Sequence, residues 1–126
     1  MKSQRFGIEI EMTGLTRRSA ALIIAKHFDT GFRHERGVYD TYSVCDQDGR
    51  KWKIVRDASI TPQCGNRFDY DPDYKVEVVS PICHYEDIET IQSIVRELRR
   101  NGHAKVNESC GIHIHVDASK HTAFTR

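Results

Sequence analysis

The chain has 126 residues, of which 38% are hydrophobic and 29% charged, the composition of one small soluble domain spanning residues 1–126. Lysine and arginine total 19 against 18 acids, so a net charge of +1 offers no basic field for nucleic acid or an anionic membrane. The longest apolar run, residues 20–25, is far shorter than the roughly 20 residues of a membrane span. The first residues lack the apolar segment of a signal peptide. We therefore expect a cytoplasmic protein with no nucleic-acid or membrane partner.

The four cysteines are widely spaced and include no CxxC pair, which excludes a zinc-ribbon pattern. They could form two disulfides in an oxidising compartment, but nothing in the N-terminal residues indicates export. We expect reduced, half-buried thiols.

The N-terminal residues predict a strand followed by a helix. Residues 5–13 alternate apolar and polar side chains, which predicts a strand with Glu9 and Glu11 on its polar face. Gly14 ends this strand, and Thr16 is a suitable N-cap for an amphipathic helix over residues 17–28. Arg17, in the first turn of that helix, is either solvated or a contact for a phosphate or carboxylate.

The middle of the chain is polar and rich in turns. Residues 38–45 and 51–56 flank the turn-like sequence DQDG, which predicts a β-hairpin. Residues 67–73 indicate a surface loop, and residues 74–80 a further strand that Pro81 ends.

The clearest helix follows His84. It has an apolar stripe made of Ile88, Ile91, Val95 and Leu98. Acidic residues cluster at its start and basic residues at its end, and Asn101–Gly102 is a stop signal. Residues 111–117 then alternate again. The order β-α-β-β-β-α-β, with hairpin-like connections, predicts an α+β fold, a mainly antiparallel sheet with two helices packed on one face.

Three predicted strands share one design, an apolar face opposite a face of metal-binding groups. These groups are Glu9 and Glu11 on the first strand, Glu77 on a later one, and His113, His115 and Asp117 on the last. Alternate residues of a strand lie about 6.5–7 Å apart on one face, so the groups converge if the strands are neighbours. Each piece alone also fits a solvated sheet face or a cross-strand pair. Together they favour a metal site.

The mixture of ligands indicates which metal. Carboxylates with a minority of imidazoles suit Mg²⁺ or Mn²⁺, especially where phosphate oxygens complete the shell. The sequence has no GxxxxGK[ST], GxGxxG or GxSxG motif, so any nucleotide must be held through the metal and side chains.

Four motifs in order resemble the amidoligases of the glutamine synthetase and glutamate–cysteine ligase superfamily. They are FGIEIEMTG at residues 6–14, WKIVRDAS at 52–59, VEVVSP at 76–81 and CGIHIHVDAS at 110–119. The resemblance implies a curved antiparallel sheet whose concave face binds Mg²⁺-ATP, or Mn²⁺-ATP.

Site residues are also implied by the resemblance. The metal ligands would be Glu9, Glu11, Glu77, His113 and His115, of which Glu9, His113 and His115 would also hold the nucleotide. Asp57 and Glu77 would be catalytic, with Asp57 accepting the proton of the attacking ammonium. Ser59 and Ser80 are either substrate contacts or turn formers.

The implied activity is an ATP-dependent carboxylate–amine ligase that forms an acyl phosphate and acts on small-molecule or peptide substrates. Two alternatives remain: a divalent-metal-dependent hydrolase using the same cluster, and a non-catalytic metal-binding domain. Ligases of this type continue beyond the HxH strand with another acidic ligand and with arginines. We therefore expect the N-terminal part of an amidoligase-like catalytic domain, with weak turnover alone, completed by self-association or another subunit.

Overall fold

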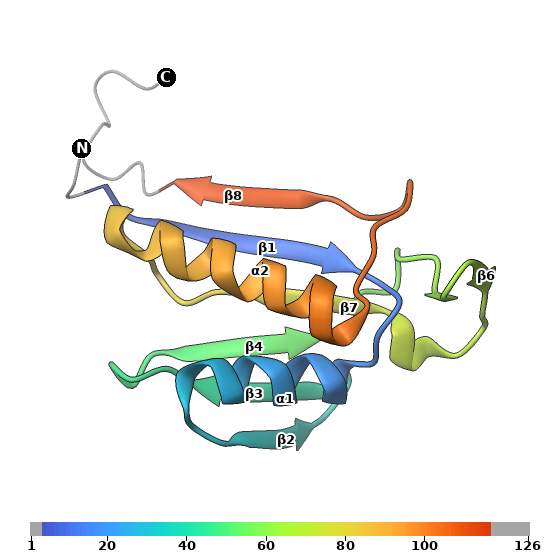
Figure 1. Ribbon diagram of the computed structural model, residues 1–126, viewed down its shortest axis with the longest axis horizontal. Coiled ribbons are helices and arrows are strands. Elements are labelled where there is room, and N and C mark those ends of the chain that lie inside the picture. Colours follow the sequence, from blue (N-terminus) through green and yellow to red (C-terminus); the bar gives the residue numbers. More distant parts are fainter. Residues whose placement is uncertain (1–3, 117–126) are drawn as a thin grey trace.

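The computed structural model describes residues 4–116, and its centre is one antiparallel sheet of six strands in the order β2-β3-β4-β7-β1-β8 (Figure 1). In chain order the main elements are β1 (Phe6–Met12), α1 (Arg17–Phe28), β2 (Phe32–Arg36), β3 (Thr41–Cys45), β4 (Lys51–Val55), β7 (Val76–Val79), α2 (Ile88–Gly102) and β8 (Ile112–Val116). Between β4 and β7, the two-residue strands β5 (Gln63–Cys64) and β6 (Arg67–Phe68) pair with each other. Two 3₁₀ turns are η1 (Pro72–Tyr74) and η2 (Tyr85–Asp87). The predicted α+β class is confirmed.

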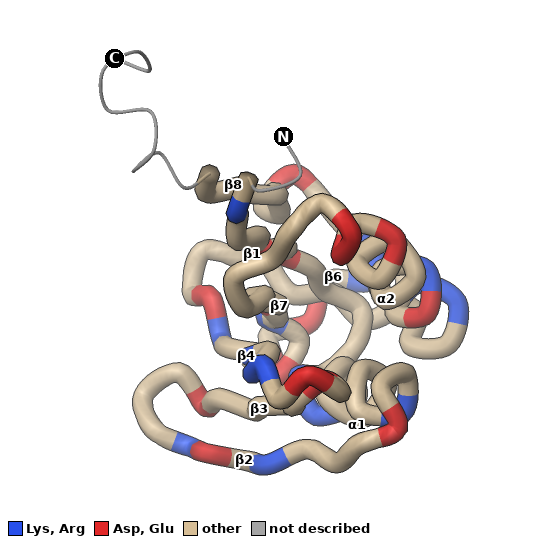
Figure 2. The backbone as a smooth tube through the Cα atoms, turned by 90° about the vertical axis from the view of Figure 1, so that its left-hand side faces the viewer, with Lys and Arg blue, Asp and Glu red and all other residues tan. Residues whose placement is uncertain are grey.

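Both helices cover the same face of the sheet, as the end-on view in Figure 2 shows. One hydrophobic core fills the space between them and the strands, and it includes Ile10, Ile24, Ile54, Val78 and Leu98. Alternate residues of each strand therefore project onto the face away from the helices. Neither helix of the described part has the length and apolar character of a membrane span.

The predicted helix boundaries depend on identifiable caps. Thr16 Oγ1 accepts the N–H of Ser19 at 3.1 Å, so α1 begins where the sequence predicts. The sequence predicts the end of the second helix at Asn101–Gly102. In the structure α2 includes Gly102, and His103 takes the left-handed conformation that ends the helix, with φ 61°. Gly102 instead lies inside the last turn, where a Cβ would sit 2.7 Å from Ile23 Cδ1 and 2.8 Å from Leu15 Cδ1. This glycine permits the close approach of the two helices.

β2 was missed by the sequence pattern, which described residues 31–36 only as polar. Arg33 and Glu35 are exposed, but Phe32 packs against the core and the His34 ring stacks on Tyr42 at 4.1 Å between centroids. The strand lies at one edge of the sheet, so only half its residues meet the core. The next strand begins at Thr41 rather than residue 38, because Gly37 and Asp40 form a turn with positive φ.

Arg17 is neither solvated nor available to an outside anion. Its guanidinium is buried and pairs with Asp40 at 2.7 Å and Asp73 at 3.2 Å, and it also donates to the carbonyls of Pro72 and Lys75. The predicted loop 67–73 is therefore tied to the start of α1 and contains β6 and the first residues of η1. This contact fixes the entry into β7.

Candidate functional site

The strands that carry the predicted ligands are neighbours in the sheet. β1 lies between β7 and β8, and its register pairs Glu11 with Glu77 and Glu9 with His113. The partner of His115 is Gly7. Since Ile10, Met12 and Val78 face the core, these polar side chains share the opposite face, the one without helices.

Glu9 is the centre of the first group of side chains. Its carboxylate lies 3.8 Å from His113 Nδ1 and 3.5 Å from His115 Nε2, and it also hydrogen-bonds the side chain of Glu77. Glu9, Glu77 and His113 each offer one ligand atom, and these atoms lie within 4.8 Å of one another. We call these three residues the outer group, because His113 belongs to the edge strand.

A second group lies beside the first, at Glu11, which is two residues after Glu9 on β1. Glu11, Asp57 and Glu77 also bring one ligand atom each to within 4.8 Å of the others, and we call them the inner group. Asp57 reaches it from the loop after β4, where the N–H and hydroxyl of Ser59 donate to Asp57 Oδ1 at 2.9 and 2.7 Å. Glu77 belongs to both groups.

Burial and the neighbouring carboxylates shift the pKa values of Glu77, Glu11 and Asp57. Burial raises the pKa of Glu77 to about 7, together with the charges of Asp57, Glu9 and Glu11. Burial also raises the pKa of Glu11, and the hydrogen bond to Asp57 adds to this shift. Burial opposes ionisation of Asp57 as well, but the bonds from Glu11 and Ser59 outweigh it and lower that pKa. A divalent cation suits this cluster because it would displace the protons and offset the repulsion.

Gly111 is a site residue that the sequence analysis did not single out. Its carbonyl accepts the Glu11 backbone N–H at 2.9 Å, and its backbone also bonds the Glu11 carboxylate, which opposes part of the rise that burial causes in the pKa of Glu11. A Cβ here would lie 3.5 Å from Glu11 Oε1. The only signal in the sequence was a glycine directly before the alternating strand.

The remaining predicted residues have structural contacts. Ser80 Oγ accepts the N–H of Ile8 at 2.9 Å and thereby joins the ends of β1 and β7. Arg56, which belongs to the motif WKIVRDAS, donates to the Val38 carbonyl at 2.8 Å and so links the end of β4 to the turn between β2 and β3. Asp117 and Ser119, which belong to the last motif, lie outside the described residues.

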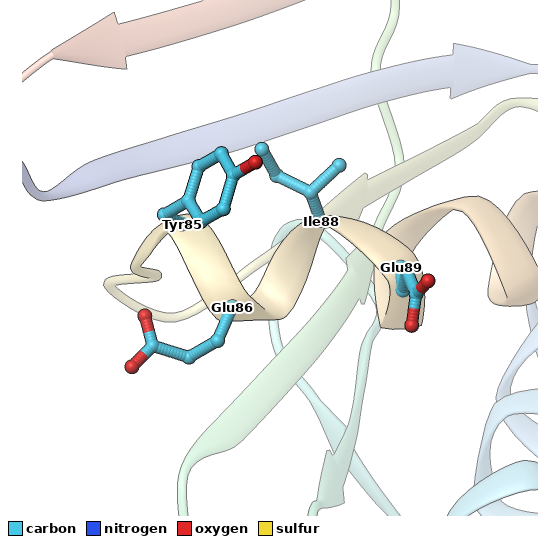
Figure 3. Close-up of a pocket in the computed structure, with 4 residues that line it drawn as sticks. All are labelled: Tyr85, Glu86, Ile88 and Glu89. Carbon is cyan, nitrogen blue, oxygen red and sulfur yellow. The ribbon is translucent and has the colours of Figure 1, made fainter. Parts of the chain in front are cut away.

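A pocket elsewhere on the surface lies at the start of α2, on the side of the sheet that the helices cover. It is lined by Tyr85, Glu86, Ile88 and Glu89 (Figure 3). The side chains of Glu86 and Glu89 extend from different turns and do not converge in that view. The pocket holds none of the predicted ligands.

Comparison with protein families matches residues 2–126 to a family described as "putative amidoligase enzyme". The chain belongs to this amidoligase family. The assignment agrees with the resemblance of the four sequence motifs, and it supports a ligase-type enzyme. Comparisons with curated proteins and with solved structures gave no significant match.

Proposed function

We propose that this amidoligase-family chain carries the metal and nucleotide site of an ATP-dependent carboxylate–amine ligase that acts through an acyl phosphate. The observation that supports this most directly is the pair of three-residue groups that share Glu77 on one face of the sheet. Two adjacent sites for divalent ions suit a reaction in which negative charge accumulates on phosphoryl oxygens.

Each group would hold one ion. The outer group offers two carboxylates and one imidazole, and the inner group offers three carboxylates. Oxygen-rich sets of this kind favour Mg²⁺ or Mn²⁺ over zinc. When bound, such ions neutralise charge on the phosphates of ATP. His115 lies 3.5 Å from Glu9 and is largely exposed, and it would contact a phosphate that reaches the outer group.

The proposed reaction has two steps. An oxygen of the substrate carboxylate attacks the γ-phosphorus of ATP; the new O–P bond forms as the bond to ADP breaks. The amine nitrogen then attacks the acyl carbon, and inorganic phosphate leaves with the electron pair of the C–O bond. Asp57 takes the proton that the ammonium must lose, because the bonds from Ser59 favour its ionised carboxylate within the inner group, where Glu11 and Glu77 would remain to hold the ion.

The first test is calorimetric titration of ATP into the 126-residue chain with Mg²⁺ or Mn²⁺. We expect binding that requires the metal and is lost in Glu77→Gln, which removes a ligand from both groups. Glu89→Gln is the matched control, since Glu89 is exposed on α2 and far from the strands' open face. Binding that persists without metal or in Glu77→Gln contradicts the proposal.

A turnover assay separates the ligase from a hydrolase. A ligase releases ADP and phosphate only when both a carboxylate and an amine are supplied, and it incorporates the amine into an amide. Release of product from phosphoesters or amides without ATP would favour the hydrolase that the HxH strand also permits.

A further inference from the structure

The inner group combines two ligands held by the sheet with one ligand held by a loop. Glu11 and Glu77 face each other on the paired strands β1 and β7. Asp57 lies after Val55, the last residue of β4, in the loop that leads to β5. The strand ladder therefore fixes two of the three carboxylates, whereas the position of the third depends on what holds residues 56–62.

A second loop, which leads from α2 into β8, crosses the end of β1 (Figure 1). Lys105 and Thr13 exchange two backbone hydrogen bonds, each 2.9 Å long, and the Gly111 carbonyl accepts the N–H of Glu11 at 2.9 Å. Residues 105–111, which we call the 105–111 loop, are thus fixed to β1 at both ends. This loop is a rigid support beside the inner group.

Asn107 joins the 105–111 loop to the loop that carries Asp57. Its Nδ2 donates to the Thr61 carbonyl at 2.9 Å and to Gln63 Oε1 at 2.5 Å. Its Oδ1 accepts the N–H and the hydroxyl of Ser109 at 3.0 and 2.5 Å. An amide can make all four bonds because its nitrogen carries two donors and its oxygen accepts two.

Thr61 is held by both of its backbone groups. Its carbonyl accepts from Asn107, and its N–H donates to Ser109 Oγ at 2.8 Å. Thr61 directly follows a turn in which the N–H of the buried Ile60 donates to the Asp57 carbonyl at 3.2 Å. A shift of Thr61 would therefore displace the turn that carries Asp57.

We propose that Asn107 is a positioning residue for Asp57. By holding Thr61, it keeps the Asp57 carboxylate within reach of the other two carboxylates of the inner group. It acts on Asp57 alone, because the strand ladder fixes the other two ligands. This inference rests on the proposed function, since it requires a divalent ion at the inner group. Contacts that orient a metal ligand typically change metal affinity by about 10–100-fold.

Calorimetric titration of Mn²⁺ into the metal-free 126-residue chain tests this role. We expect Asn107→Ala to weaken one of the two Mn²⁺ sites by about 10–100-fold, because Asp57 is then no longer held beside the ion. In Asp57→Asn the same site is already weakened, and adding Asn107→Ala should reduce its affinity further by less than about twofold. A general effect on stability would instead give equal losses in both backgrounds.

Asn101→Ala is the matched control, since Asn101 is exposed in the last turn of α2, where its amide donates to Glu97. It should keep the wild-type affinity. An unchanged affinity in Asn107→Ala, or equal losses with and without Asp57, overturns this inference and leaves the metal site standing. A wild-type chain that binds no Mn²⁺ contradicts the proposed function, and this inference with it.

Ser109→Ala provides a second variant if circular dichroism shows that Asn107→Ala does not fold. It removes the acceptor of the Thr61 N–H and keeps the Asn107 amide. We expect a smaller loss of Mn²⁺ affinity that again disappears in the Asp57→Asn background. A loss that persists in that background would show that these contacts do not act through Asp57, and the inference would be wrong.

Discussion

The Glu77 carboxyl is partly buried and lies beside the carboxylates of both three-residue groups, and these surroundings disfavour its charged form. Its pKa rises from 4.5 to about 7 through burial and the charges of Asp57, Glu9 and Glu11. Between these values the folded protein keeps a proton that the unfolded chain has lost, so the free energy of unfolding falls as pH rises through this window. In chelator, we expect Glu77→Gln to reduce this slope and to gain about 1–3 kcal/mol above pH 7, measured by urea unfolding.

Glu89→Gln is the control for this pH dependence, because its carboxylate is exposed and outside the cluster. It should keep the wild-type slope. An unchanged slope in Glu77→Gln would mean that Glu77 ionises normally in the folded protein, and the electrostatic description of the cluster would then be wrong.

Asp57 provides a second prediction at the scale of single residues. The proposed proton acceptor keeps its hydrogen-bond partners in Asp57→Asn but loses its basicity. We expect ligase turnover to fall by about 10²–10⁴-fold, with a smaller loss of ATP binding than in Glu77→Gln, because Asp57 belongs to the inner group alone. The measurement is steady-state amide formation at saturating amine, with ATP binding by calorimetry. A variant that retains turnover would exclude Asp57 as the base.

The sequence predicted which candidate ligands share a face of each strand, but it did not predict how the strands bring them together. Alternation placed Glu9 with Glu11 and His113 with His115, because side chains two apart share a face of any strand. That Glu77 faces Glu11 depends on strand order and register, which local patterns do not encode. The support of Asp57 by Ser59 and of Glu11 by Gly111 depends on loop conformations, so it appeared only in the structure.

At the scale of elements, Gly14 joins β1 to α1 under two constraints. Its φ is 89°, and a Cβ would lie 2.6 Å from the backbone oxygen of His103 at the end of α2. We expect Gly14→Ala to lower the free energy of unfolding by about 2–3 kcal/mol, because both the backbone and the contact are incompatible with a side chain. Denaturant unfolding measures the difference.

Gly31→Ala is the matched control, since a Cβ at Gly31 meets no atom within 4 Å and its φ is not positive. It should be neutral or slightly stabilising. Equal losses in both variants would show that Gly14 has no special conformational role.

Periodicity predicted both helices because Thr16 caps one and a buried stripe on the other includes Ile91 and Leu98. It failed for β2, whose edge position leaves its arginines and glutamate in solvent. Edge strands are hard to predict from the sequence because many of their side chains face solvent and are polar, so the apolar alternation of a strand is weak.

At the scale of the whole molecule, the candidate site joins distant parts of the chain. The outer group takes Glu9 from the first described strand and His113 from the last, and Glu77 comes from between the two helices. Unfolding must therefore disperse the ligands, so a bound ion should stabilise the entire fold by mass action. At a free ion concentration of about 100 times the dissociation constant, this gain is about 2.7 kcal/mol.

Trp52 reports this stabilisation because it is the only tryptophan, is buried on the core side and donates its indole N–H to Asp46. Above the pKa of Glu77, Mn²⁺ should raise the denaturant midpoint of Trp52 fluorescence, and chelator should reverse the change. Glu9→Gln should lose most of the shift, because it removes one ligand and leaves the two imidazoles without their carboxylate. Glu89→Gln should keep it. If Glu9→Gln responds to Mn²⁺ as the wild type does, the ion stabilises the protein from another position, and the outer group does not bind it.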